Sequence, residues 1–181
     1  FACMDCLRLR SVRDLFELPY SETTVDKMPT GAGQWHQVRL AWELAHGTTL
    51  PPFLRSVFDP NDDWVERLRR QSAEPSRTQL DISRALKNLG FEIEDEFVCA
   101  NGLSVDILVR LVAGENVAVE VDGPTHFLLD GVTPTGKTLF KRRLLAPVFK
   151  RLISVNVVQD WEPVRHDVAA QHELLRRVIS N

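Results

Sequence analysis

A ten-residue segment, VAVEVDGPTH at positions 117–126, constrains the fold of this chain more than any other feature. Its first six residues are typical of a β-strand, whose side chains alternate between two faces. The three valines therefore share one face, and Glu120 and Asp122 share the other. Two unit charges about 7 Å apart repel by roughly 2 kcal/mol at an effective dielectric constant near 20. A divalent cation, a basic side chain or a shared proton is expected to relieve this repulsion.

A second predicted strand, residues 103–109, has the same asymmetry, with apolar residues on one face and Asp106 on the other. Pairing with the first strand would bring Asp106 to Glu120 and Asp122, beside a Gly-Pro turn that delivers His126. Three acids that converge from two strands are typical of a metal-dependent nuclease site. The alternative is structural, with Asp106 at a strand end and Asp122 at the start of a turn.

The part of the chain from Ser76 onward predicts one α/β domain, residues 76–181. Ser76 and Gln79 have the spacing of a capping box, and the helix they begin is expected to end at Gly90. Strands are predicted over residues 91–98, 103–111 and 117–122, a helix over 137–149, a strand over 151–157 and a helix over 166–179. Short turns join the first three strands, which indicates an antiparallel meander. Pro147 is expected to end or kink the first of the two later helices. We predict that the valines of residues 117–121 are core, and that Glu120 and Asp122 open onto a cleft.

Residues 1–75 are predicted to form a helical region that packs on or leads into this domain, and one interpretation is the end of a helical-repeat array. The chain starts at Phe1 without an initiator Met, which is expected of a fragment of a longer protein. Helices are expected over 2–17, over 34–45 and from Asp59-Pro60, with prolines between them, including Pro29 with its neighbouring glycines. The stripe of Trp35, Val38, Trp42 and Ala45 is interpreted as core packing rather than as a base-stacking platform.

Cysteine usage and composition exclude little. Cys3 and Cys6 have zinc or redox spacing but no second ligand pair, so two reduced thiols are the favoured interpretation, and Cys99 stands alone. With 44% hydrophobic and 26% charged residues, the chain can bury one sizeable core, and no apolar run approaches the length of a membrane span.

Charge is distributed unevenly along the chain. The formal net charge of -3 argues against a protein that coats nucleic acid uniformly. Between Asp130 and Asp160, however, there is no acidic residue. That stretch holds a run of cations, which predicts a phosphate-binding surface rather than a neutralised helix face. The predicted nucleic-acid-binding residues are Lys137, Lys141, Arg142, Arg143, Lys150 and Arg151.

Residues 131–138, GVTPTGKT, satisfy the P-loop pattern for nucleotide phosphates. A P-loop follows directly from a buried parallel strand, whereas here eight residues separate the predicted strand from the loop and the preceding strands are expected to be antiparallel. Nucleotide hydrolysis is therefore disfavoured. The amides of Gly136, Lys137 and Thr138 at a helix N-terminus remain candidates for gripping an RNA phosphate.

Four motifs in order resemble the RAP domain, which closes many mitochondrial and plastid RNA-metabolism proteins, including relatives of the Fas-activated serine/threonine kinase family. They are EVDGPTHF at 120–127, GKTLFKRRLL at 136–145, ISV at 153–155, and Trp161. The resemblance covers about residues 117–175.

The segment from residue 76 extends the resemblance to the PD-(D/E)XK endonuclease fold and its very-short-patch-repair-like branch. That resemblance implies a restriction-endonuclease-like core, a small mixed or antiparallel sheet flanked by helices. Asp106 matches the acid of one strand and Glu120 the acid of the central strand. Gln79 stands where a helix acid is expected, and Asp122 stands at the usual lysine position.

The resemblance implies RNA binding by an organellar RNA-processing or ribosome-assembly factor, in mitochondria or plastids. Single-stranded RNA and ribosomal or RNA-processing proteins are the expected partners, and no membrane is expected. One alternative is a metal-dependent endoribonuclease, and another is an inactive structural component of an RNA–protein particle. For the enzyme, Mg²⁺ or Mn²⁺ would be held by Asp106, Glu120 and Asp122, with His126 as general base or acid and Lys137 or Lys141 to offset charge. Otherwise no cofactor is predicted.

Overall fold

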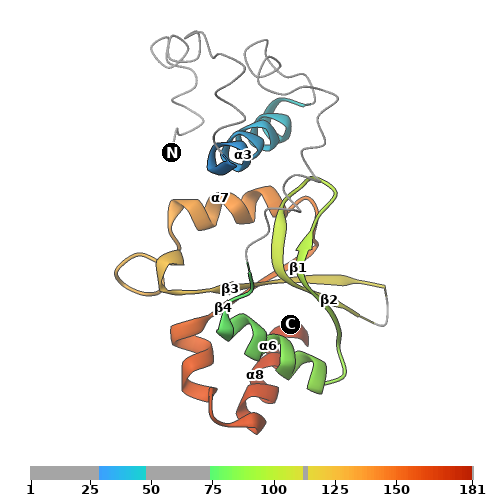
Figure 1. Ribbon diagram of the computed structural model, residues 1–181, viewed down its shortest axis with the longest axis vertical. Coiled ribbons are helices and arrows are strands. Elements are labelled where there is room, and N and C mark those ends of the chain that lie inside the picture. Colours follow the sequence, from blue (N-terminus) through green and yellow to red (C-terminus); the bar gives the residue numbers. More distant parts are fainter. Residues whose placement is uncertain (1–28, 48–73, 112–113, 181) are drawn as a thin grey trace. The chain divides into compact units, whose positions relative to one another are not determined.

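The computed structural model describes residues 29–47, 74–111 and 114–180 (Figure 1). Residue contacts divide the chain into two units, Phe1–Trp64 and Val65–Asn181, which are described separately. The predicted helices over 2–17 and from Asp59-Pro60, together with Cys3 and Cys6, lie outside the described residues.

In the first unit the described element is the helix α3, Pro29–His46. It is longer than the predicted helix over 34–45. The expectation that Pro29 and its neighbouring glycines separate helices is wrong, because proline is well tolerated in the first turn of a helix, where its missing N–H has no intrahelical partner. His36 and Ala41 are buried, whereas Ala45, expected in the core stripe, is exposed.

The second unit is built on a sheet of four strands in the order β1-β2-β3-β4. The first three strands pair antiparallel, as predicted, and the fourth runs parallel to β3. Their bounds are Glu92–Val98 for β1, Ser104–Arg110 for β2, Asn116–Asp122 for β3 and Arg151–Asn156 for β4.

Three helices flank this sheet, with α7 on one face and α6 and α8 on the other (Figure 1). Their bounds are Arg77–Asn88 for α6, Gly136–Leu145 for α7 and Val168–Ser180 for α8, and single turns are formed by η2 (Pro124–His126), η3 (Val157–Trp161) and η4 (Glu162–Val164). The predicted α/β class with a small mixed sheet flanked by helices is confirmed. That the core is endonuclease-like stays a prediction.

Local chemistry accounts for the ends of the helices. The Ser76 hydroxyl oxygen accepts the Gln79 N–H at 3.1 Å, and Gly90, with φ of 86°, follows the end of α6. A capping box also requires the Gln79 side chain to accept the backbone N–H of Ser76. This part of the prediction is wrong, because the Gln79 side chain donates to Glu96 and to the Asp106 carbonyl instead. Helix α7 ends at Leu145, two residues before Pro147, as expected for a residue that lacks a helical N–H.

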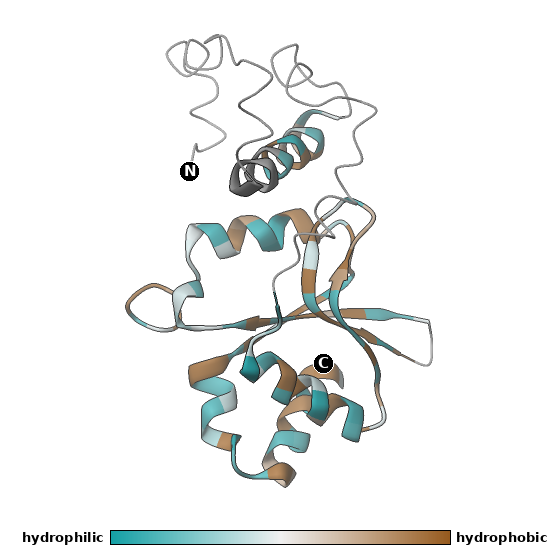
Figure 2. Cartoon of the chain, viewed as in Figure 1, coloured by the Kyte–Doolittle hydropathy of each residue, from teal (hydrophilic) through white to brown (hydrophobic). Residues whose placement is uncertain are grey.

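The core lies between the sheet and the pair α6 and α8, whose apolar residues face it (Figure 2). Val117, Val119 and Val121 all belong to this core, which confirms the predicted alternation of β3. In the described part of the chain, no helix has the length and apolar character needed to cross a membrane.

Candidate functional site

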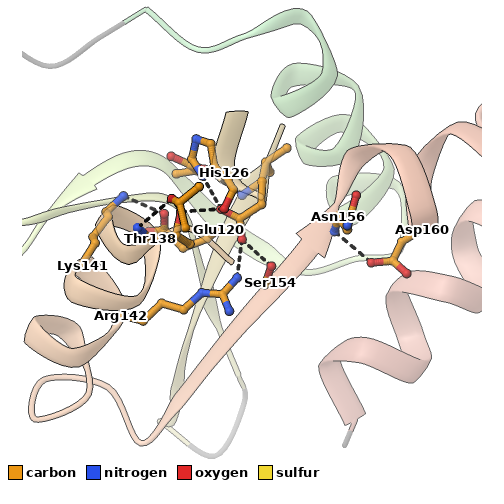
Figure 3. Close-up of polar contacts among 12 residues, drawn as sticks. Glu120, His126, Thr138, Lys141, Arg142, Ser154, Asn156 and Asp160 are labelled. Atoms are coloured by element: carbon orange, nitrogen blue, oxygen red, sulfur yellow. Dashed lines mark hydrogen bonds and ion pairs between the residues drawn. The ribbon is translucent and has the colours of Figure 1, made fainter. Parts of the chain in front are cut away.

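The polar face of β3 is covered by α7 and is not an open cleft. Glu120 and Asp122 keep only 3% and 1% of their surface exposed. The prediction that these two residues open onto a cleft is therefore wrong. The cause is visible in Figure 3: Lys141 Nζ lies 2.6 Å from Glu120 Oε2, and Arg142 Nη2 lies 2.6 Å from Asp122 Oδ2. The repulsion between the two carboxylates is thus relieved by two basic side chains from one turn of α7.

Asp122 joins four elements at the end of β3. Besides Arg142, its carboxylate accepts the Ser154 hydroxyl of β4 and lies 2.5 Å from Nδ1 of His126 in η2. Burial acts to raise the pKa of Asp122, but the hydrogen bonds from Ser154 and Arg142 outweigh it and hold the pKa below its ordinary value. Because the carboxylate is ionised, His126 Nδ1 donates to it. That bond fixes the tautomer of a half-exposed imidazole.

Glu120 behaves in the opposite way. Burial raises its pKa to about 7 against the opposing charge of Lys141, and Asp106 adds a smaller upward contribution. The Oε1 atom is buried without a hydrogen-bond partner among the described residues. Burial acts to lower the pKa of Lys141, but its contact with Glu120 prevails and raises it. Lys141 is therefore the candidate lysine that reaches the acids, and Lys137 is exposed at the start of α7.

Asp106 lies where β2 separates from β3. Their pairing ends at Ile107 and Val119, and beyond that point the Asp106 carboxylate accepts the Val121 N–H at 2.7 Å. On its other side, the Gln79 amide donates to the Asp106 carbonyl at 2.9 Å and to Glu96 Oε1 at 2.8 Å. Gln79, where the resemblance to the endonuclease fold predicts a helix acid, thus supplies hydrogen-bond donors where an acid would add charge.

Sequence reasoning missed Glu96. It lies opposite Asp106, since Asp95 pairs with Ile107 and Phe97 with Val105. Burial raises its pKa, opposed by the Gln79 hydrogen bond. Its φ of 51° falls in the left-handed region, which is unusual for a non-glycine residue within a strand. Pairing the predicted strands across their short turn would have placed Glu96 beside Asp106.

The predicted metal ligands are not assembled as a metal site. Among the described residues, no three His, Cys, Asp or Glu side chains form a group that could hold a metal ion. Asp106 accepts a backbone N–H, Glu120 pairs with Lys141, and Asp122 pairs with Arg142. A cation that recruited these carboxylates would have to displace two basic side chains, so the residues as they lie do not fit a metal.

The six predicted RNA-binding cations fall into two groups. Lys141, Arg142 and Arg151 are engaged inside the domain; Arg151 donates to the Ile179 carbonyl at the end of α8. The other three, the outer basic surface, are exposed and have no ion pair or hydrogen bond within the described part of the chain. They are Lys137, Arg143 and Lys150.

The segment with the P-loop pattern is engaged in internal contacts. The Thr138 N–H donates to the Thr135 hydroxyl oxygen at 3.4 Å, and the Thr138 hydroxyl donates to the His126 carbonyl at 3.0 Å. The three strands before the loop pair antiparallel with one another, as predicted, but β3 also runs parallel to β4. The eight residues between β3 and the loop still set this segment apart from a P-loop. The amides of Gly136 and Lys137 lie in the first turn of α7, where backbone N–H groups have no intrahelical acceptor, and their use by a phosphate stays a prediction.

Comparison with known proteins agrees with the resemblance drawn from the motifs. The fold and the site define a small α/β domain whose basic helix neutralises buried acids. The chain is 36% identical over 104 residues, 58% of its length, to a RAP domain-containing chloroplastic protein of rice, Oryza sativa subsp. japonica. The predicted resemblance to a RAP domain protein is thereby confirmed. No protein-family model matches the chain, and the match spans 15% of the length of the rice protein.

Proposed function

We propose that this chain binds single-stranded RNA through the outer basic surface, as part of a plastid RNA-processing or ribosome-assembly factor. The observation that carries the proposal is the division of the cations. Three of them are engaged in contacts inside the domain. The other three, Lys137, Arg143 and Lys150, are exposed and lie in a stretch that contains no acidic residue. Exposed cations without internal partners are available to neutralise phosphates.

The setting of this function rests on the relative. The rice protein is named as chloroplastic, which favours a plastid over a mitochondrion for this chain. The RAP resemblance favours RNA as the ligand. Ribosomal or RNA-processing proteins as further partners remain part of the proposal.

The test is the salt dependence of RNA binding. Replacing Lys137, Arg143 and Lys150 together by alanine should weaken binding to single-stranded RNA and flatten the plot of log K against log salt by about 0.7 per lost contact. The matched control replaces the exposed Arg77, Arg176 and Arg177 of α6 and α8, across the sheet, and removes the same charge. Equal slopes for the wild type and the variant of Lys137, Arg143 and Lys150 would remove the outer basic surface from the interface.

A metal-dependent endoribonuclease is the second candidate function, favoured by one observation. Among the described residues, Glu120 Oε1 is buried without a hydrogen-bond partner, and neighbouring Asp106 adds to the rise of the Glu120 pKa. Incubating labelled RNA with Mg²⁺, Mn²⁺ or EDTA decides between the two. If cleavage requires metal and is lost in the Asp106→Asn, Glu120→Gln double variant, the function is RNA hydrolysis rather than RNA binding alone. A protein that neither binds nor cleaves RNA would instead be a structural component of a particle.

A further inference from the structure

A pocket opens beside the start of β3, at the other end of that strand from Asp122. It has a volume of about 320 Å³ and lies between the end of β1, the start of β3 and the turn that joins α7 to β4. Asn116, in its lining, begins β3, and Asp122 ends it. Six residues of strand separate these two positions by about 20 Å, whereas Cys99, on the other wall of the pocket, lies close enough to Glu120 and Lys141 for their charges to act on its pKa.

The pocket combines an aromatic wall with charged and polar groups. Phe97 and Phe149 meet edge to face, with ring centroids 6.5 Å apart at 73°, and both line it. Buried Cys99 adds an uncharged thiol, because burial raises its pKa to about 11. On the polar side stand Glu115 and Asn116, both exposed and both able to hydrogen-bond a ligand.

The pocket is continuous with the outer basic surface. Lys150, one of the three cations of that surface, lines the pocket, and Arg151 lines it from the first position of β4. A ligand that enters beside Phe97 and Phe149 would keep a negative charge next to Lys150. The surroundings therefore suit a flat apolar group with hydrogen-bonding edges, attached to an anion.

We propose that this pocket receives one unstacked base of a single-stranded RNA whose backbone follows the outer basic surface. The inference rests on the proposed RNA binding and adds base contact to it. Sequence-specific proteins recognise single-stranded RNA by packing splayed bases on aromatic side chains and by hydrogen bonds to the base edges. Phe97 and Phe149 supply the first element, Asn116 and Glu115 the second, and Lys150 the phosphate contact.

The experiment uses the full chain and two RNAs of equal length, one normal and one with abasic ribose throughout, so that both carry the same phosphates. The wild type is expected to bind the normal RNA at least about fivefold more tightly, the lower range of one base–aromatic contact. Phe97→Leu keeps the apolar volume but removes the aromatic face. It should abolish most of this preference and leave the salt slope unchanged. The matched control is Phe127→Leu, another half-buried phenylalanine outside the pocket, which should retain the preference.

Asn116→Ala provides a second measurement, since it removes a hydrogen-bonding edge at an exposed position. Affinities for oligo(A), oligo(C) and oligo(U) should move closer together in this variant. The proposal that the pocket receives a base is overturned if the wild type binds normal and abasic RNA equally, or if Phe97→Leu and Asn116→Ala leave the preferences intact. In either case the salt slope of the outer basic surface would persist. A failure of the proposed function would instead show no RNA binding, or a salt slope that is unchanged when Lys137, Arg143 and Lys150 are replaced.

Discussion

Glu120 and Asp122 are the same kind of residue two positions apart on one strand face, yet their environments push their pKa values in opposite directions. Asp122 receives hydrogen bonds from Ser154, Arg142 and His126, which favour the charged form. Glu120 has a single partner, Lys141, and one buried oxygen without any. The number of donors, and not burial alone, decides which carboxylate stays ionised.

The pH dependence of stability should report this difference. The folded-state pKa of Glu120 is about 7, above its ordinary value of 4.5, so the unfolded chain releases the proton first as the pH rises. Glu120 therefore costs stability progressively between about pH 4.5 and pH 7, and its full cost is present above pH 7. Glu120→Gln removes this titration. Urea unfolding at pH 5 and pH 8 should show the wild type losing stability relative to the variant at the higher pH, and parallel curves would contradict the raised pKa.

At the scale of elements, much of the second unit could be predicted from sequence, because alternation and turn residues are local signals. Three antiparallel strands, the apolar face of β3 and the end of α7 before Pro147 all followed from them. The rotation of α7 about its axis could not be predicted. Lys137 and Lys141 lie one turn apart, yet only Lys141 reaches an acid. Which side of a basic helix faces inward depends on the partner acids across the sheet, a tertiary contact that charge spacing does not encode.

Asp122 is the residue that links α7 to β3 and β4, so its removal should loosen these elements together. Asp122→Ala would leave the Arg142 guanidinium without its buried partner, a change that typically costs about 3–5 kcal/mol. The free energy of unfolding, measured with denaturant, checks this value. Asp81→Ala is the matched control, since it breaks an exposed pair with Arg84, whose side chain is 70% exposed, and should cost less than about 1 kcal/mol. Similar losses in both variants would show that the Asp122 contacts contribute little.

At the scale of the whole molecule, the features that carry the proposed function lie in the second unit. Among the described residues, the main core cluster falls between Ile82 and Ile179, and the four strands form one sheet. The outer basic surface and the base pocket lie there too. Sequence reasoning found this region through its motifs, whereas for residues 1–75 periodicity alone was informative. Periodicity placed a helix at α3, but the helix starts at Pro29 rather than at residue 34, and Ala45, predicted in the core stripe, is exposed.

A fragment of residues 65–181 is therefore expected to fold by itself. It keeps the whole core, the Ser76 cap of α6 and the Gln79 hydrogen bonds to Glu96 and Asp106. Circular dichroism should show cooperative thermal unfolding, and the fragment should bind single-stranded RNA with the same salt slope as the full chain. A shorter fragment, 81–181, lacks the cap and leaves Glu96 and the Asp106 carbonyl without the Gln79 amide, so it should melt at a clearly lower temperature. If the longer fragment does not unfold cooperatively, the first unit is required for the fold; if it folds but loses the salt slope, RNA binding requires the residues before 65.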